Sequence, residues 1–283
     1  MTTNEQEKQF WSSAAGKKWI EHEQALDTAM QGMLDAVLGA AAIEPNGQVL
    51  DIGCGTGAST IQIAQALDSG QVLGADISAP LLDRAQARAS ALNLDNIAFR
   101  VADAQVDDFD GQRFDVLVSR LGMMFFADPV VAFKNLSAAL RPGGRMAFIC
   151  WTRISDNPWF QIPKQAAEQQ LGSLPPPSEP NAPGPTAFRD RGRVSDLVTK
   201  AGLIDVQAKK VEIALTPPGG LSGAAFAASS IGPASRIMKA FNGTGDDAKA
   251  IEAQVRQNFE QFQVDGQVFV PAQLNLFTCR TPS

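Results

Sequence analysis

Three glycines at alternate positions are the residues of this sequence most plainly suited to holding a ligand. They lie in the stretch VLDIGCGTGA (49–58) as Gly53, Gly55 and Gly57. Glycine is placed this densely where the backbone adopts a positive φ or must approach a ligand closely. The spacing Gly53-x-Gly55-x-x-Ala58 also satisfies the dinucleotide-binding fingerprint. The stretch therefore predicts a ligand-binding loop that at least two different cofactors could occupy.

Three aspartates narrow the choice of ligand. Asp76 follows Gly57 by 19 residues, and an acid there suits the hydroxyls of a ribose in either NAD or S-adenosylmethionine. Asp51 lies two residues before the first glycine, where a carboxylate repels a pyrophosphate and favours an ammonium or sulfonium group. S-adenosylmethionine carries both of those cations and has no phosphate. Asp103, which the small Ala104 follows, is expected to face an adenine amino group.

Other chemistry is poorly represented in the sequence. The one histidine, His22, is the candidate general base, although a lone histidine on a helix is usually a surface residue. Three cysteines lie far apart and no His/Cys cluster occurs, so we expect no metal site. The pattern G-x-x-x-x-G-K-[ST] is absent, which excludes a P-loop.

Alternating apolar runs and amphipathic stretches must position these side chains. Short apolar runs predict strands over 48–53, 71–77, 97–103, 114–120 and 145–151. Helical spacing between the runs predicts helices over 59–67, 78–89 and 128–140, with Ser78 and Asp128 as N-caps. RPGG (141–144) predicts the turn that ends the last of these helices.

Strands separated by helices indicate βαβ units in a doubly wound, mostly parallel sheet, which is a Rossmann-like α/β fold. Ligands of such sheets bind beyond the carboxyl ends of the strands. The glycine loop, Asp76, Asp103 and the pair Ser119-Arg120 all lie at the carboxyl ends of predicted strands. We therefore expect them to meet in one cleft.

The remaining segments predict the organisation of the chain. We expect an N-terminal helical cap (1–45), a core (46–215 and 271–283) and an inserted helical lid or substrate region (216–270). The proline-rich stretch 174–185 predicts an exposed loop within the core. Further predicted elements are a helix over 193–203, strands over 205–215 and 273–280, and helices near 223–241 and 246–262.

Five motifs in order resemble those of the class I S-adenosylmethionine-dependent methyltransferases. They are VLDIGCGTG, GADIS, VADAQ, FDVLVSR and LRPGGR. The stretches FWSSAAGKKWIEHEQALD, SRLGMMFFADPVVAF and PNAPGPTAF are similar to those of a bacterial subgroup related to the ubiquinone and menaquinone C-methyltransferases. The likeness covers nearly the whole chain, and its motifs are specific for the cofactor but not for the methyl acceptor.

This resemblance implies a seven-stranded sheet whose last strand, 273–280, is reversed. By position it implies that Gly53, Gly55 and Gly57 hold the methionine portion of the cofactor, with Asp51 on its amino group. It also implies the following contacts around the rest of the cofactor: Asp76 with the ribose, Ile77 with the adenine face, Asp103 and Ala104 with the adenine edge, Ser119 (through its carbonyl) and Arg120 near the methionine end, and Trp19 closing over the site.

Composition excludes several classes of partner. Lys plus Arg total 24 and Asp plus Glu total 30, giving a net charge of −6. We therefore expect no nucleic-acid binding, because that requires basic surface. No run of about 18 apolar residues predicts a membrane span, and the N-terminus lacks the apolar core of a signal peptide. With three scattered cysteines, the expected location is the cytoplasm, and the sequence predicts no particular oligomeric state.

The expected reaction is an in-line transfer of a methyl group to a carbon, oxygen, nitrogen or sulfur nucleophile of a small molecule. Because the methyl donor is already activated, the protein mainly aligns the acceptor, which contributes about 7–11 kcal/mol. Two alternatives stay open. An NAD-dependent oxidoreductase fits the glycine pattern, but the chain has no tyrosine and hence no Tyr-x-x-x-Lys pair. The second alternative is a non-catalytic regulatory protein that binds S-adenosylmethionine.

Overall fold

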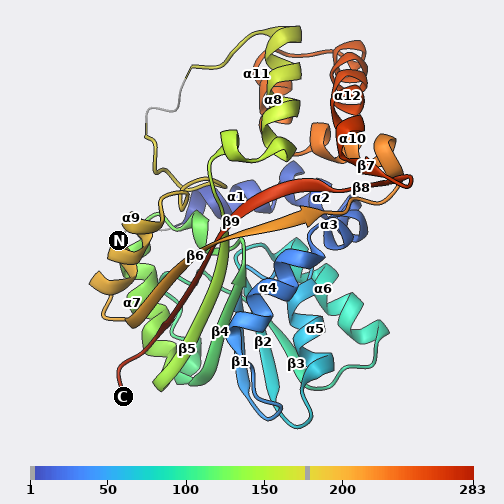
Figure 1. Cartoon of the computed structure of the whole chain (residues 1–283). Helices are drawn as coiled ribbons and strands as arrows, with labels where there is room; N and C mark the ends of the chain where they lie inside the picture. Colours follow the sequence, from blue (N-terminus) through green and yellow to red (C-terminus); the bar gives the residue numbers. More distant parts are fainter. Residues whose placement is uncertain (1–3, 176–178) are drawn as a thin grey trace.

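The computed structural model describes residues 4–175 and 179–283 and consists of a seven-stranded sheet with helices on both faces (Figure 1). The strands of this sheet are β1 (Gln48–Ile52), β2 (Gln71–Asp76), β3 (Ile97–Val101), β4 (Phe114–Arg120), β5 (Leu140–Trp151), β6 (Ile204–Leu215) and β9 (Val270–Arg280). The helices against it are α4 (Gln31–Ala41), α5 (Ala58–Ala66) and α6 (Ala79–Ala91) on one face, and α7 (Pro129–Ala139) and α9 (Arg191–Lys200) on the other.

The strand order, β3-β2-β1-β4-β5-β9-β6, reverses direction between β1 and β4. The pairs β1–β2, β2–β3, β1–β4 and β4–β5 are parallel, whereas β9 is antiparallel to both β5 and β6. The prediction of a seven-stranded, mostly parallel sheet with a reversed last strand is confirmed. Its switch point, the crevice at which such folds bind ligands, lies at the carboxyl ends of β1 and β4.

The central strands are apolar on both faces because helices cover both faces. Val49 and Leu50 of β1 are fully buried, as is Leu117 of β4. Such near-continuous apolar runs are typical of parallel strands in the middle of an α/β sheet. Asp51 interrupts this apolar run and is also fully buried, so neighbouring groups must stabilise its carboxylate by hydrogen bonds or opposite charge.

Four short N-terminal helices precede the sheet, and the first three lie between it and an upper group of helices (Figure 1). They are α1 (Glu5–Trp11), α2 (Ala14–Glu21), α3 (Glu23–Ala29) and the sheet helix α4. Residues of this segment reach three different strand ends: the Asn4 side chain contacts Asp103 after β3, the Trp11 carbonyl contacts Ser78 after β2, and the Asp27 side chain contacts Arg120 at the end of β4. The N-terminal segment therefore covers the predicted ligand cleft.

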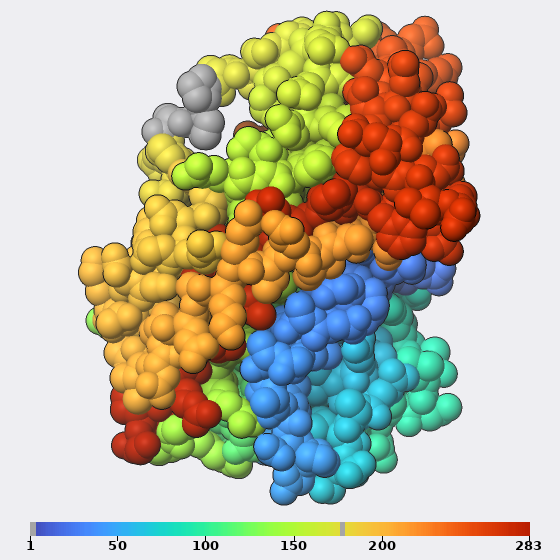
Figure 2. Space-filling model, viewed as in Figure 1, coloured from blue at the N-terminus to red at the C-terminus, as the bar shows by residue number. Residues whose placement is uncertain are grey.

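The upper group consists of four helices that pack mainly on one another. They are α8 (Pro158–Leu171), α10 (Gly220–Ser230), α11 (Pro233–Ala240) and α12 (Gly245–Phe259). A hairpin of β7 (Gln263–Val264) and β8 (Gln267–Val268) follows them. In the space-filling view these helices stand above the layer that contains the sheet (Figure 2). α10, α11 and α12 all come from the stretch between β6 and β9, where the sequence predicts an inserted helical region.

Three local predictions are wrong in detail. The helix predicted over 223–241 is two helices, because Gly232, at φ +93°, and Pro233 break it. β5 begins at Leu140, so RPGG lies within the strand as an irregularity of the β4–β5 register. Ser78 occupies the N-cap position of α6, but its hydroxyl donates to the Trp11 carbonyl at 2.9 Å and does not cap the helix. Of the predicted proline-rich loop 174–185, residues 176–178 lie outside the described residues and the rest is neither helix nor strand.

Candidate cofactor site

The glycine loop connects β1 to α5 at the switch point of the sheet. Gly53, Gly55 and Gly57 have φ values of +67°, +57° and +84°, in the left-handed region that favours glycine. The Gly53 and Cys54 N–H groups donate to the Ala75 carbonyl at 2.8 and 3.3 Å. These bonds tie the loop to the end of β2.

Gly53 also lies against a glycine that the sequence analysis missed. A Cβ on Gly53 would be 2.6 Å from the Cα of Gly122, and a Cβ on Gly122 would be 2.6 Å from the Ile52 carbonyl oxygen. Gly122 follows β4 and has an ordinary φ of −79°. Its requirement for glycine therefore comes from the close approach of two chain segments, which no local pattern predicts.

Asp51 is a buried carboxylate with one satisfied and one unsatisfied oxygen. Oδ2 accepts hydrogen bonds from Ser59 Oγ at 2.6 Å and Thr60 Oγ1 at 2.7 Å. Oδ1 has no partner among the described residues. Burial raises the pKa of Asp51, while the two hydroxyl bonds and the charge of Arg120 lower it. A buried carboxylate oxygen without a partner in the polypeptide is costly and is well suited to a cationic ligand.

Asp76 holds the tip of the glycine loop and the start of α6 together. Its Oδ2 accepts from the Gly55 N–H and its Oδ1 from the Ser78 N–H, both at 2.9 Å. Burial raises the pKa of Asp76 to about 6 against the opposing effect of these bonds. Each carboxylate oxygen can accept a second hydrogen bond, so the group has capacity left for hydroxyl donors. The half-buried Ile77 follows it directly.

Asp103, after β3, is held by the N-terminal segment. The Asn4 carboxamide donates to Asp103 Oδ1 at 2.7 Å and accepts from the Ala127 N–H at 2.7 Å. The Gln105 N–H also donates to Asp103 Oδ1, at 3.0 Å, and Ala104 is buried beside it. Asn4 lies 99 residues before Asp103 and sits in no motif, so sequence reasoning missed this contact.

Ser119 and Arg120, the last two residues of β4, make different contacts. Ser119 Oγ donates to the Ile52 carbonyl at 2.7 Å and accepts from the Gly122 N–H at 3.2 Å, joining the ends of β1 and β4. Arg120 Nη2 donates to Asp27 Oδ1 at 3.3 Å. Arg120 Nη1 is buried and finds no partner within the part of the chain that the structure describes.

Trp19 of α2 lies beside the glycine loop, whereas His22 points elsewhere. A Cβ on Gly55 would be 3.8 Å from Trp19 Nε1, and the rings of Trp19 and Trp11 meet edge to face at 6.0 Å between centroids. The His22 ring instead lies 5.4 Å from the Phe226 ring of α10. The structure thus brings Trp19 to the strand ends and sets His22 against the upper helices.

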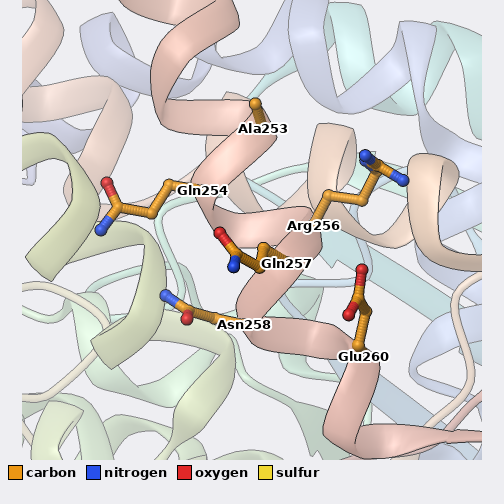
Figure 3. A pocket seen from close by; sticks show the side chains of 6 residues that line it. All are labelled: Ala253, Gln254, Arg256, Gln257, Asn258 and Glu260. Atoms are coloured by element: carbon orange, nitrogen blue, oxygen red, sulfur yellow. The ribbon is translucent and has the colours of Figure 1, made fainter.

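Two surface depressions lie away from these residues. One is formed by successive side chains of α12, including Gln254, Gln257 and Asn258 (Figure 3). The other lies where β5 begins and β9 ends, between Arg145 and Arg280. Neither contains a predicted site residue. Within residues 4–175 and 179–283, no group of three or more His, Cys, Asp or Glu side chains could hold a metal, and no helix is long and apolar enough to cross a membrane.

Comparison with known proteins identifies the segment that carries this geometry. Residues 49–144, which run from β1 into β5, match the family of methyltransferase domains. Residues 49–144 form a methyltransferase domain. The matched residues include Asp51, the glycine loop, Asp76, Asp103 and the Ser119-Arg120 pair, and they exclude α8 and the helices α10–α12. The upper group of helices therefore lies outside the match.

Three relatives give the extent of the similarity. A trans-aconitate 2-methyltransferase of Deinococcus radiodurans is 40% identical over 103 residues, covering 36% of this chain and 37% of its own. The aklanonic acid methyltransferase DauC of Streptomyces is 36% identical over 102 residues, covering 36% and 46%. The protein Rv1405c of Mycobacterium tuberculosis is 35% identical over 116 residues, and the chain spans 41% of its length. The relation to quinone C-methyltransferases stays a prediction.

Solved structures support the fold of the whole chain. A phosphoethanolamine N-methyltransferase 2 of Haemonchus contortus in complex with S-adenosyl-L-methionine has a TM-score of 0.59 at 17% identity, covering 100% of this chain and 61% of that one. YcgJ of Bacillus subtilis has a TM-score of 0.55 at 15% identity, covering 88% and 98%. At these identities the likeness concerns architecture, not substrate.

Proposed function

We propose that this chain is an enzyme that transfers the methyl group of S-adenosylmethionine to a nucleophilic atom of a small molecule. The observation that carries the proposal is the buried Asp51 carboxylate, whose Oδ2 is held by Ser59 and Thr60 while its Oδ1 has no partner among the described residues. A carboxylate so placed at the mouth of the glycine loop fits the ammonium of the cofactor's amino-acid end. It disfavours a pyrophosphate, because like charges repel strongly in a poorly solvated site.

The neighbouring acids fit the nucleoside end of the same ligand. Asp76 has acceptor capacity beyond the backbone bonds from Gly55, Ser78 and Ile77, which suits a ribose diol. Asp103 and Ala104 lie one strand further along, at the place expected for the adenine edge. In this proposal, Ile77 packs on the adenine face and the backbone of Ser119 borders the methionine end.

When bound, S-adenosylmethionine supplies an activated methyl group whose transfer releases a neutral thioether. The work left to the chain is to orient the donor, to admit the acceptor in line and to exclude water. Trp11 and Trp19 contribute an apolar cover over the glycine loop. Alignment of this kind is worth about 7–11 kcal/mol without any proton transfer, so a soft nucleophile or a stabilised carbanion requires no dedicated base.

The acceptor is a small molecule in this proposal because the named relatives methylate small molecules: trans-aconitate in one case and aklanonic acid in another. The upper helices α8 and α10–α12 form the acceptor side of the site. An NAD-dependent oxidoreductase is not favoured, since the Asp51 carboxylate would repel a pyrophosphate bound at the glycine loop. Residence in the cytoplasm and the lack of nucleic-acid binding stay predictions.

Incubation of the protein with methyl-labelled cofactor and a cell extract, followed by mass spectrometry, tests the proposal. We expect label to appear in a small-molecule fraction. The variant Asp51→Asn, which keeps the shape but removes the charge, should lose most of this labelling. Cofactor binding with no labelled product from any extract would support the regulatory alternative instead. Equal labelling by wild type and Asp51→Asn would refute the role given to this carboxylate.

A further inference from the structure

The strand β6 is an edge of the sheet whose outer side is open. It is the last strand in the order of the sheet, and among the strands that the structure describes it pairs with β9 alone. Its atoms, in orange, form part of the front surface of the molecule (Figure 2). Alternate residues of such a strand direct their N–H and C=O groups away from the sheet, where another strand can pair with them.

β6 lacks most of the features that prevent pairing at the edges of natural sheets. Such edges are usually short, or they carry a proline, a bulge or isolated charges. β6 runs from Ile204 to Leu215 without a proline. Its one irregularity lies at its start, where the register with β9 shifts between Ile204 and Gln207. From Gln207 to Leu215 the pairing with β9 is regular, so this whole segment can accept a second strand.

Symmetry restricts how β6 pairs with the same strand of a second copy. In an antiparallel pair related by a two-fold axis, one residue must face its own counterpart, because hydrogen-bonded and non-hydrogen-bonded residue pairs alternate along the ladder. Val211 is the centre of the regular segment Gln207–Leu215. With the axis at Val211, the full segment overlaps with its copy, and Gln207 of each copy faces Leu215 of the other.

The charges of β6 favour the same register. With Val211 on the axis, Lys210 of each copy faces Glu212 of the other. An axis at Lys209, Lys210 or Glu212 would instead place like charges opposite each other, which destabilises a sheet. The Lys210 and Glu212 side chains are 43% and 73% exposed, and within one chain Lys210 Nζ lies 3.7 Å from Glu212 Oε1. They therefore share one face of the strand, and both are accessible to a second copy.

We propose that β6 pairs antiparallel with β6 of a second copy of this chain, with the two-fold axis at Val211, so that the two sheets become one continuous sheet. Because the two copies of β6 run in opposite directions, the carboxyl ends of the parallel strands point in opposite directions in the two copies. The two glycine loops then lie on opposite sides of the dimer. The proposal does not depend on the reaction that the chain catalyses.

Sedimentation equilibrium of the full chain and of charge-reversed variants tests both the dimer and its register. The wild type should dimerise. Lys210→Glu and Glu212→Lys each place like charges across the interface and should raise the dissociation constant of the dimer by about tenfold or more. The double variant Lys210→Glu/Glu212→Lys should dimerise as the wild type does. An equimolar mixture of the two single variants should also dimerise, because each then offers the other an opposite charge at both positions.

Lys249→Glu is the matched control, since it makes the same change of charge in an exposed pair with Asp246 on α12 and should leave the dissociation constant unchanged. Urea unfolding checks that each variant is folded, and if one single variant is not, the other and the double variant carry the comparison. A wild type that stays monomeric, single variants that dimerise as tightly as the wild type, or a mixture that dimerises no more tightly than its components would each overturn the proposal.

Discussion

The cost of replacing Gly53 by alanine can be predicted quantitatively, because two other glycines separate its two causes, a positive φ and a close neighbour. Gly53 has both a positive φ of +67° and a close neighbour, the Gly122 Cα, 2.6 Å from where its Cβ would be. Gly143 has a similar φ of +72° but no atom within 4 Å of its Cβ position. Gly122 has the close neighbour but an ordinary φ of −79°.

The magnitudes follow from these differences. An alanine in the left-handed region costs about 1–2 kcal/mol, partly offset by about 0.4–1 kcal/mol from the reduced entropy of the unfolded chain. Gly143→Ala should therefore cost about 1 kcal/mol. A Cβ on Gly53 would lie 2.6 Å from the Gly122 Cα, and a Cβ on Gly122 would lie 2.8 Å from the Gly53 Cα. Both distances are far inside the usual 3.5–4.0 Å between carbons, and overpacking of this kind costs about 1–3 kcal/mol. Gly122→Ala should cost that amount, and Gly53→Ala the two together, about 2–4 kcal/mol.

Urea unfolding followed by tryptophan fluorescence measures these free energies. Calorimetry with S-adenosylhomocysteine should show that the two variants also differ in ligand affinity. Gly53→Ala must move β1 away from β4 and so weaken binding. Gly143→Ala, at the start of β5, should leave binding unchanged. If Gly53→Ala costs no more than Gly143→Ala, the close approach of β1 and β4 does not constrain the loop, and the reasoning is refuted.

Three further predictions concern single side chains of the site. The pKa of Asp76 is raised from 3.8 to about 6. Its contribution to stability, roughly 3 kcal/mol, is therefore present below pH 3.8 and is lost as pH rises through 6. The fall in unfolding free energy between pH 3.8 and 6 should be shallower in Asp76→Asn than in the wild type. Ser59→Ala removes a donor to Asp51 and should lower the unfolding free energy by about 1–3 kcal/mol at pH 7, a result that an unchanged urea midpoint would contradict. His22→Ala should keep turnover within about tenfold, because its ring packs on Phe226; a loss of 100-fold or more with cofactor affinity intact would instead mark a general base.

The sequence predicted the fold and the strand ends well because both depend on local signals. Apolar runs and helical spacing indicated the strands β1–β5 and the helices between them. Because parallel strands have their carboxyl ends at the same edge of the sheet, Asp51, Asp76 and Asp103 could be predicted to lie at that edge. The errors occurred where neighbours in space decide. Ser78 stands at a helix start, but the Trp11 carbonyl takes its hydroxyl. RPGG, at 141–144, has turn composition, yet pairing with β4 carries it into β5.

The residues that sequence reasoning missed act through long-range contacts. Asp27 reaches Arg120 across 93 positions of the chain, and Asn4 reaches Asp103 across 99. Neither belongs to a motif, and an isolated polar residue in an N-terminal helix carries no local sign of its partner. Gly122 was missed for a related reason, since its φ is ordinary and only the packing of β1 against β4 requires the absence of a side chain.

Calorimetric titration of the wild-type protein with S-adenosylhomocysteine and with NAD, alongside Asp51→Asn, tests the central claim most directly. We predict that S-adenosylhomocysteine binds and that NAD does not. Asp51→Asn should weaken the binding of S-adenosylhomocysteine by about tenfold or more, through loss of one charge-assisted contact. Binding of NAD without binding of S-adenosylhomocysteine would contradict it.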